Sequence, residues 1–106
     1  MHYIKYIDWC LPIYTQVINE NLPAVYIQHD QGPDYNALLS YLRNALNDNN
    51  LYYELLSELR YRSVLIFFDT EEERDSFFDI FMYSILYGAM YACTYDQFGN
   101  VITENT

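Results

Sequence analysis

The chain has 106 residues, 52% of them hydrophobic, and a formal net charge of -10 from 15 acidic and five basic residues. This length and apolar content suit one core, so we expect residues 1–106 to form a single domain. A surface this negative repels phosphate groups, which argues against direct binding of nucleic acid or an anionic membrane. It attracts basic surfaces, including the nucleic-acid-binding site of another protein. The simpler interpretation is that the acidity keeps an aromatic-rich domain soluble.

Two features bear on the cellular compartment. No stretch reaches the ~18 apolar residues of a membrane span, and the start of the chain lacks the pattern of a secretory signal. The only two cysteines, Cys10 and Cys93, each lie in an apolar stretch. We therefore expect a cytoplasmic protein whose two thiols are reduced and buried in the core.

The first twenty residues carry an ambiguous apolar pattern. Apolar side chains recur there at steps of three and four, as on one helix face: Tyr3, Tyr6, Ile7, Cys10, Tyr14, Val17 and Ile18. Pro12 either kinks a long helix or occupies the first turn of a shorter one. We expect a helix over residues 11–19. The secondary structure of the first ten residues is left undecided, since residues 2–7 also fit a short strand of period two.

The middle of the chain is predicted to form a strand followed by two helices. Pro23 precedes a β-prone run over residues 24–29, which ends in a turn at residues 30–34. Asp34 is a suitable N-cap for a helix over residues 35–46, and a second helical pattern follows over residues 52–60.

The last third alternates strands and a helix. Residues 64–68 are consecutive β-prone apolar residues, which predicts a central strand covered on both faces. Thr70 and Glu73 form a capping box for a helix over residues 71–87. The remaining elements are a strand over residues 90–95, a turn over 96–100 and a short arm over 101–103. This order predicts an α+β fold, a small sheet packed with helices, most simply of ferredoxin-like character.

No catalytic or metal-binding motif is present. The possible soft metal ligands are His2, His29, Cys10 and Cys93, and none stands at a zinc-site spacing. The three glycines are isolated, which excludes the glycine-rich nucleotide-binding loops. His29 and Asp30 are more simply explained as a polar pair at a strand end than as an acid-base pair. We expect a protein that is not an enzyme and has no metal and no cofactor.

The most informative segment is the acidic start of the helix over residues 71–87. Glu71, Asp75 and Asp79 are four residues apart and share one helix face, with about 6 Å between successive carboxylates. They form a ladder of negative charge such as a DNA-mimicking inhibitor would display. The alternative is an ordinary solvated helix face, softened by Arg74.

The same helix is apolar almost all round. A helix against a sheet needs one apolar stripe, so a second stripe at Ile80, Tyr83 and Tyr87 needs its own cover. Another helix of the domain or a homodimer interface would supply it. With 13 tyrosines in the chain, we expect a protein-binding surface. Its predicted residues are Glu71, Glu72, Asp75, Asp79, Tyr83 and Tyr87.

The acidic composition and the strand-to-acidic-helix unit over residues 64–73 resemble small bacteriophage anti-defence proteins, including anti-CRISPR and DNA-mimic inhibitors. The resemblance implies an inhibitor or regulator, acting in the cytoplasm of a host cell, that binds a basic surface of a host protein. The alternative is a structural or assembly module that homodimerises through its aromatic helix, with acidity serving solubility alone.

Overall fold

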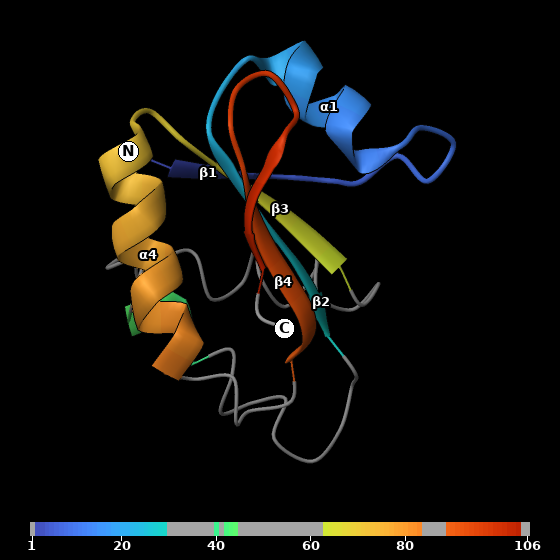
Figure 1. Cartoon of the computed structure of the whole chain (residues 1–106). Helices are drawn as coiled ribbons and strands as arrows, with labels where there is room; N and C mark the ends of the chain where they lie inside the picture. The colour runs from blue at the N-terminus through green and yellow to red at the C-terminus, as the bar shows by residue number, and fades with distance from the viewer. Residues whose placement is uncertain (1, 30–39, 41, 45–62, 84–88, 105–106) are drawn as a thin grey trace.

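The computed structural model describes residues 2–29, 40, 42–44, 63–83 and 89–104 (Figure 1). Its elements are β1 (His2–Lys5), α1 (Ile13–Glu20), β2 (Ala24–His29), β3 (Ser63–Phe68), α4 (Glu71–Tyr83), β4 (Ala89–Tyr95) and β5 (Val101–Glu104). The predicted α+β class is confirmed. Of the helices predicted over residues 35–46 and 52–60, residues 40 and 42–44 are helical and the rest lie outside the described ranges.

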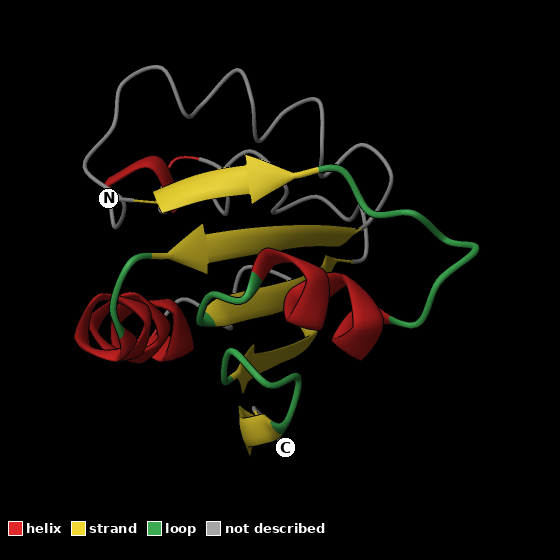
Figure 2. Ribbon diagram, turned by 90° about the horizontal axis from the view of Figure 1, so that it is seen from above, coloured by secondary structure: helices red, strands yellow, loops and turns green. Residues whose placement is uncertain are grey.

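The five strands form one antiparallel sheet in the order β1-β3-β2-β4-β5 (Figure 2). All six residues of β3 are buried, which confirms the prediction that residues 64–68 form an inner strand covered on both faces. The strand predicted at residues 90–95 and the arm at 101–103 are confirmed as β4 and β5. All four residues of β5, at one edge of the sheet, are exposed.

The helices lie on opposite faces of this sheet, which differs from the two-layer ferredoxin-like arrangement we expected. β1 and β2 are parallel with β3 between them, and β3 and β4 are parallel with β2 between them. Both crossovers step the same way along the sheet, but they start from strands that point in opposite directions. Right-handed crossovers therefore put α1 and α4 on different sides, and the fold has three layers (Figure 1).

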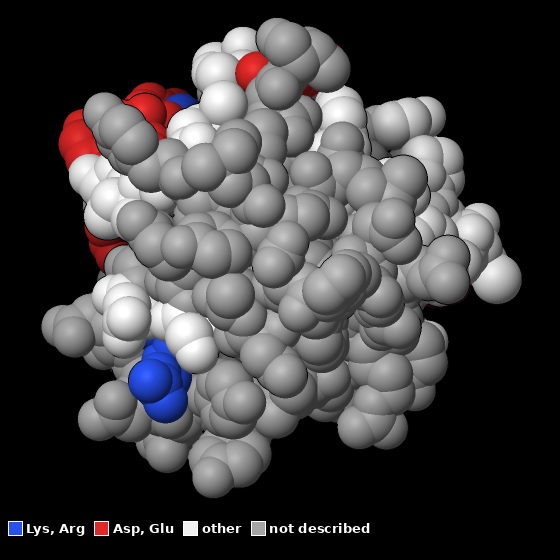
Figure 3. All heavy atoms as spheres, turned by 90° about the horizontal axis from the view of Figure 1, so that it is seen from below, with Lys and Arg blue, Asp and Glu red and all other residues white. Residues whose placement is uncertain are grey.

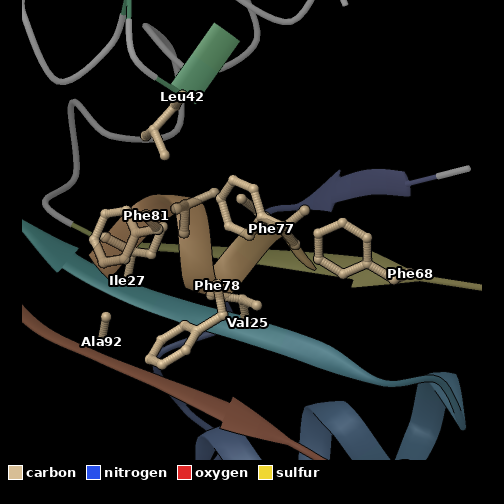
Figure 4. Packing of buried hydrophobic residues seen from close by; sticks show 10 residues of the cluster. Val25, Ile27, Leu42, Phe68, Phe77, Phe78, Phe81 and Ala92 are labelled. Carbon is tan, nitrogen blue, oxygen red and sulfur yellow. The ribbon is translucent and has the colours of Figure 1, made fainter. Parts of the chain in front are cut away.

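Alternate residues of the strands serve the two faces. On the α4 face, strand residues such as Val25, Ile66 and Phe68 pack against the helix residues Phe77, Phe78 and Phe81, and Leu42 completes this cluster (Figure 4). On the α1 face, the buried cluster contains Ile7, Val17, Ala24, Tyr26, Leu65, Phe67, Cys93 and Tyr95. In the described part of the chain, no helix has the length and apolar character needed to cross a membrane.

The N-terminal segment, whose first ten residues the apolar spacing left open, is a strand followed by a loop. Residues 2–5 form a strand, as the period-two alternative held, and a loop follows to Pro12. Pro12 is the N-cap of α1, with an extended ψ of 149°. The residue before a proline avoids the helical region, which explains why the helix does not start at Leu11 as predicted. The helix ends at Asn21, which adopts a left-handed conformation.

Candidate functional site

Helix α4 turns one stripe toward the core and the opposite stripe toward solvent. Arg74, Phe77, Phe78 and Phe81 are buried, at the three- and four-residue steps of a single helix face. The predicted site residues Glu71, Glu72, Asp75 and Asp79 are all exposed. The structure therefore brings these four carboxylates together on the solvent side of α4.

The start of α4 explains why the acidic face is helical at all. The Glu73 backbone N–H donates to the Thr70 hydroxyl over 3.2 Å, and that hydroxyl lies 3.3 Å from the Glu73 carboxylate. This is the predicted cap, and it satisfies one of the free N–H groups of the first turn. Glu73 is thus part of the cap, whereas Glu71 and Glu72 stand free of it at the positive end of the helix dipole.

Asp75 differs from the other three carboxylates because it neutralises a buried cation. The Arg74 guanidinium is only 3% exposed and lies 2.9 Å from the Asp75 carboxylate, which is itself 59% exposed. The same guanidinium donates to the backbone carbonyl of Tyr95 over 3.0 Å, at the end of β4. Within the described ranges, Glu71, Glu72 and Asp79 have no ion-pair partner. These three residues therefore supply most of the uncompensated negative charge on the solvent side of α4.

The spacing of charge on this face can be compared with that of a nucleic-acid strand. Residues 71–79 rise about 12 Å along the helix axis, so the four carboxylates are on average about 4 Å apart along it. One strand of DNA carries one charge per 3.4 Å. With Asp75 offset by Arg74, the mean spacing becomes about 6 Å. Acidic atoms gather at the edge of the molecule where α4 lies (Figure 3).

A hollow of about 320 Å³ adjoins the acidic face, between α4 and the start of β1. Its lining joins aromatic rings of Phe68 and Phe77 with the carboxylates of Glu72 and Glu73, and it also includes His2, Ser76 and Ile80. Phe68 and Phe77 are only 3% and 2% exposed, so the group that can attract a lysine or arginine side chain there is the exposed carboxylate of Glu72.

The two tyrosines predicted for the site are placed only in part. Tyr83 is the last residue of α4, and its side chain lies outside the described residues, as does Tyr87. Of the second apolar stripe, Ile80 is 43% exposed. The described part of α4 therefore shows an acidic outer face with one exposed aliphatic side chain.

Sequence reasoning missed a second surface, on the other side of the sheet. Five large apolar side chains around α1 are between 41% and 67% exposed: Trp9, Leu11, Tyr14, Ile18 and Phe98. We call this set the α1 surface. The apolar pattern over residues 3–18 includes only Tyr14 and Ile18 of this set, and residue type alone does not distinguish an exposed apolar side chain from a buried one.

The loop that carries Trp9 and Leu11 is held by a buried glutamine. The Gln16 amide donates to the carbonyls of Asp8 and Leu11 over 2.8 and 3.2 Å, and it accepts from the Asp8 N–H over 3.0 Å. The Asp8 carboxylate accepts from the Cys10 N–H over 2.9 Å. These bonds fix the backbone of the loop, so its apolar side chains are displayed in a defined position.

Phe98 is brought to α1 by the turn between β4 and β5. Gly99 has a φ of +83°, and a Cβ there would lie 2.9 Å from both the Tyr14 carbonyl oxygen and the Ile18 side chain. The turn therefore packs directly on α1 (Figure 2). Burial acts to raise the pKa of Asp96, but hydrogen bonds from Asn100 and from the Phe98 N–H prevail and hold that pKa below its usual value.

The far end of α1 is fixed to β1 by charge. Glu20 accepts hydrogen bonds from the Lys5 ammonium and the Tyr3 hydroxyl, which hold the pKa of its carboxyl below the usual value. Both Lys5 and Arg74 are thus paired with carboxylates. Neither Lys5 nor Arg74 therefore offsets the exposed negative charge of Glu71, Glu72 or Asp79.

The prediction that both thiols are buried is half right. Cys93 is buried in the α1-side cluster, and burial raises the pKa of its thiol. Cys10 is exposed, because it lies in the loop before Pro12 and not on a helix face. Both are free cysteines. Over the described ranges, no group of three or more His, Cys, Asp or Glu side chains is placed to hold a metal ion.

No protein family model, no curated protein and no solved structure matches this chain.

Proposed function

We propose that the chain is a binding protein, not an enzyme, and that it inhibits or regulates a host protein by occupying its basic, nucleic-acid-binding surface. The acidic face of α4 is the contact region. The observation that carries the proposal is the set of four exposed carboxylates on one helix face, on average about 4 Å apart along the helix axis, where one DNA strand has a charge every 3.4 Å. The resemblance to small bacteriophage anti-defence proteins supports the same class of partner.

The role of the charge is to speed encounter with the partner. Clustered charge steers a basic surface toward α4 over long range and raises the association rate, an effect that salt suppresses. Close contact then depends on particular side chains. The hollow beside Glu72 offers a place for one cationic side chain of the partner, since the exposed Glu72 carboxylate is part of its lining.

The test is capture from a host lysate followed by measured binding. We expect immobilised wild-type protein to retain a basic, nucleic-acid-binding protein, identified by mass spectrometry. Double-stranded DNA should compete for it, and its affinity should fall steeply with added salt. A triple variant, Glu71→Gln with Glu72→Gln and Asp79→Asn, should lose about tenfold or more in association rate at low salt.

The matched control removes one exposed carboxylate at a time. Asp79→Asn removes one negative charge from α4, whereas Glu104→Gln removes one from the exposed edge strand β5. The proposal requires a larger loss of association rate for the α4 variant. Equal losses would mean that net charge alone drives binding, and an unchanged triple variant would remove α4 from the contact region.

The assembly-module alternative has one supporting observation, the exposed Ile80 on the outer face of α4. Dimerisation through that face would bring Glu72 and Asp79 of two copies together, and like charges oppose such contact. A self-association that disappears on Ile80→Asp substitution would favour this alternative.

A further inference from the structure

We propose that the α1 surface is a homodimer interface, at which two copies of the chain pack through Trp9, Leu11, Tyr14, Ile18 and Phe98. It uses different residues from the proposed partner site and the opposite face of the sheet. The two proposals therefore stand or fall separately. One patch facing its own copy makes a closed, two-fold symmetric contact, the commonest arrangement in soluble oligomers.

The size of the α1 surface fits a dimer. The five side chains are between 41% and 67% exposed, and at about 200 Å² for each they present roughly 500 Å² of apolar area. A patch of that size is at the upper end of what monomers expose. A standard interface buries about 800 Å² on each partner, of which about 60% is apolar, or roughly 500 Å². The exposed apolar area is thus what a second copy needs to cover.

The distribution of charge favours a second copy despite the net charge of -10. Asp8 and Asp96, the acidic residues on the segments that carry Trp9 and Phe98, keep their charge, but both carboxylates accept internal hydrogen bonds. The acidic face of α4 lies beyond the sheet. In a dimer through the α1 surface the two α4 helices have both sheets between them, well beyond a Debye length of about 8 Å at physiological salt. Repulsion between them is therefore largely screened.

The surface is also held in shape before any partner arrives. Gln16 fixes the loop that carries Trp9, and the close approach of Gly99 to Tyr14 and Ile18 fixes the turn that carries Phe98. A contact between such pre-organised parts loses little conformational entropy. A dimer of this form presents two acidic α4 faces on opposite sides, which makes it bivalent toward a basic partner.

The experiment follows the single tryptophan of the chain, which lies in the α1 surface. We expect sedimentation of the full chain to shift from monomer to dimer between about 1 and 100 µM. Over the same range the fluorescence of Trp9 should shift to shorter wavelength as the indole leaves water. Added salt should leave the dimer unchanged or strengthen it, in contrast to binding through α4.

Two matched variants decide where the interface lies. Ile18→Asp and Ile80→Asp place the same charge at side chains that are 46% and 43% exposed, on opposite faces of the sheet. We expect Ile18→Asp to weaken the dimer by about thirtyfold or more and Ile80→Asp to leave it intact. Because Ile18 also contacts the turn at Gly99, Trp9→Ala serves as a second variant, read by sedimentation. It should weaken the dimer without affecting the fold.

Three results would overturn the proposal. A monomeric mass at every concentration would show that no second copy binds. A dimer that Ile80→Asp disrupts and Ile18→Asp does not would place the interface on α4. A dimer that forms with no change in Trp9 fluorescence would place it elsewhere in the chain. The first and third results do not bear on whether α4 binds a basic partner. The second would also count against the proposed function, because it puts a second copy on the acidic face of α4.

Discussion

The helices on the two faces of the sheet expose different kinds of side chain, and the sequence predicted the exposed residues of one helix better than those of the other. On the α4 face, the aromatic residues Phe77, Phe78 and Phe81 are buried and the carboxylates are outside. On the α1 face, Val17 and Gln16 are buried while Tyr14 and Ile18 stay in solvent. Helix α4 buries its phenylalanines and keeps its carboxylates outside, whereas α1 buries Gln16 and leaves two large apolar side chains exposed.

The difference teaches where residue type predicts exposure and where it does not. A carboxylate goes to solvent almost regardless of the fold, so the outer face of α4 follows from helical spacing alone. An apolar side chain has no such constraint, because folded proteins leave much apolar area exposed. For α1 the fold decides, since Gln16 takes the inward position that binds the loop backbone.

The largest effect should come from removing that glutamine. Gln16→Ala deletes three hydrogen bonds to Asp8 and Leu11 and leaves part-buried backbone groups unsatisfied. We expect a loss of about 3 kcal/mol in the free energy of unfolding, measured by denaturant titration. Asn19→Ala, an exposed position on the same helix, is the control and should change stability by no more than about 0.5 kcal/mol. Equal effects would mean that Gln16 does not hold the loop.

The next effect concerns the turn at Gly99. Gly99→Ala forces a side chain into a left-handed conformation and places a Cβ 2.9 Å from the Tyr14 carbonyl oxygen. We expect a loss of about 2 kcal/mol in the free energy of unfolding. The dimer should also weaken, because Phe98 moves away from α1. Gln97→Ala, in the same turn, should leave both properties nearly unchanged. A Gly99→Ala protein as stable as wild type would show that the turn does not pack tightly on α1.

The fold was predictable where local signals agree with tertiary packing. The β-prone runs gave β2, β3 and β4, and the Thr70 cap gave the start of α4. The order of strands was not predictable, because it depends on pairing between distant segments such as β1 and β3. The positions of α1 and α4 on opposite faces follow from that order and the handedness of the crossovers.

The candidate site was predictable in its residues but not in their roles. Glu71, Glu72 and Asp79 are exposed as expected from helical spacing. That Asp75 has a structural role depends on Arg74 folding back to the end of β4, which no local pattern reveals. The α1 surface was missed because Tyr14 and Ile18 recur at the period of a buried helix face, while Trp9, Leu11 and Phe98 come from loops that no periodic pattern joins to α1.

The smallest effect separates two carboxylates of the acidic face that look equivalent in the sequence. Asp75→Asn removes the negative charge beside the buried Arg74 guanidinium, but it leaves an acceptor oxygen at position 75 and the bond from Arg74 to the Tyr95 carbonyl. Because Asp75 is 59% exposed, water screens part of the loss, and we expect about 1.5 kcal/mol in the free energy of unfolding. Asp79→Asn should cost no more than about 0.5 kcal/mol, since Asp79 has no ion-pair partner among the described residues. Partner binding should show the reverse order, with the larger loss of association rate for Asp79→Asn. Equal stability of the two variants would mean that the ion pair between Arg74 and Asp75 does not stabilise the fold. Asp75 would then be equivalent to Asp79 as an exposed carboxylate of the acidic face.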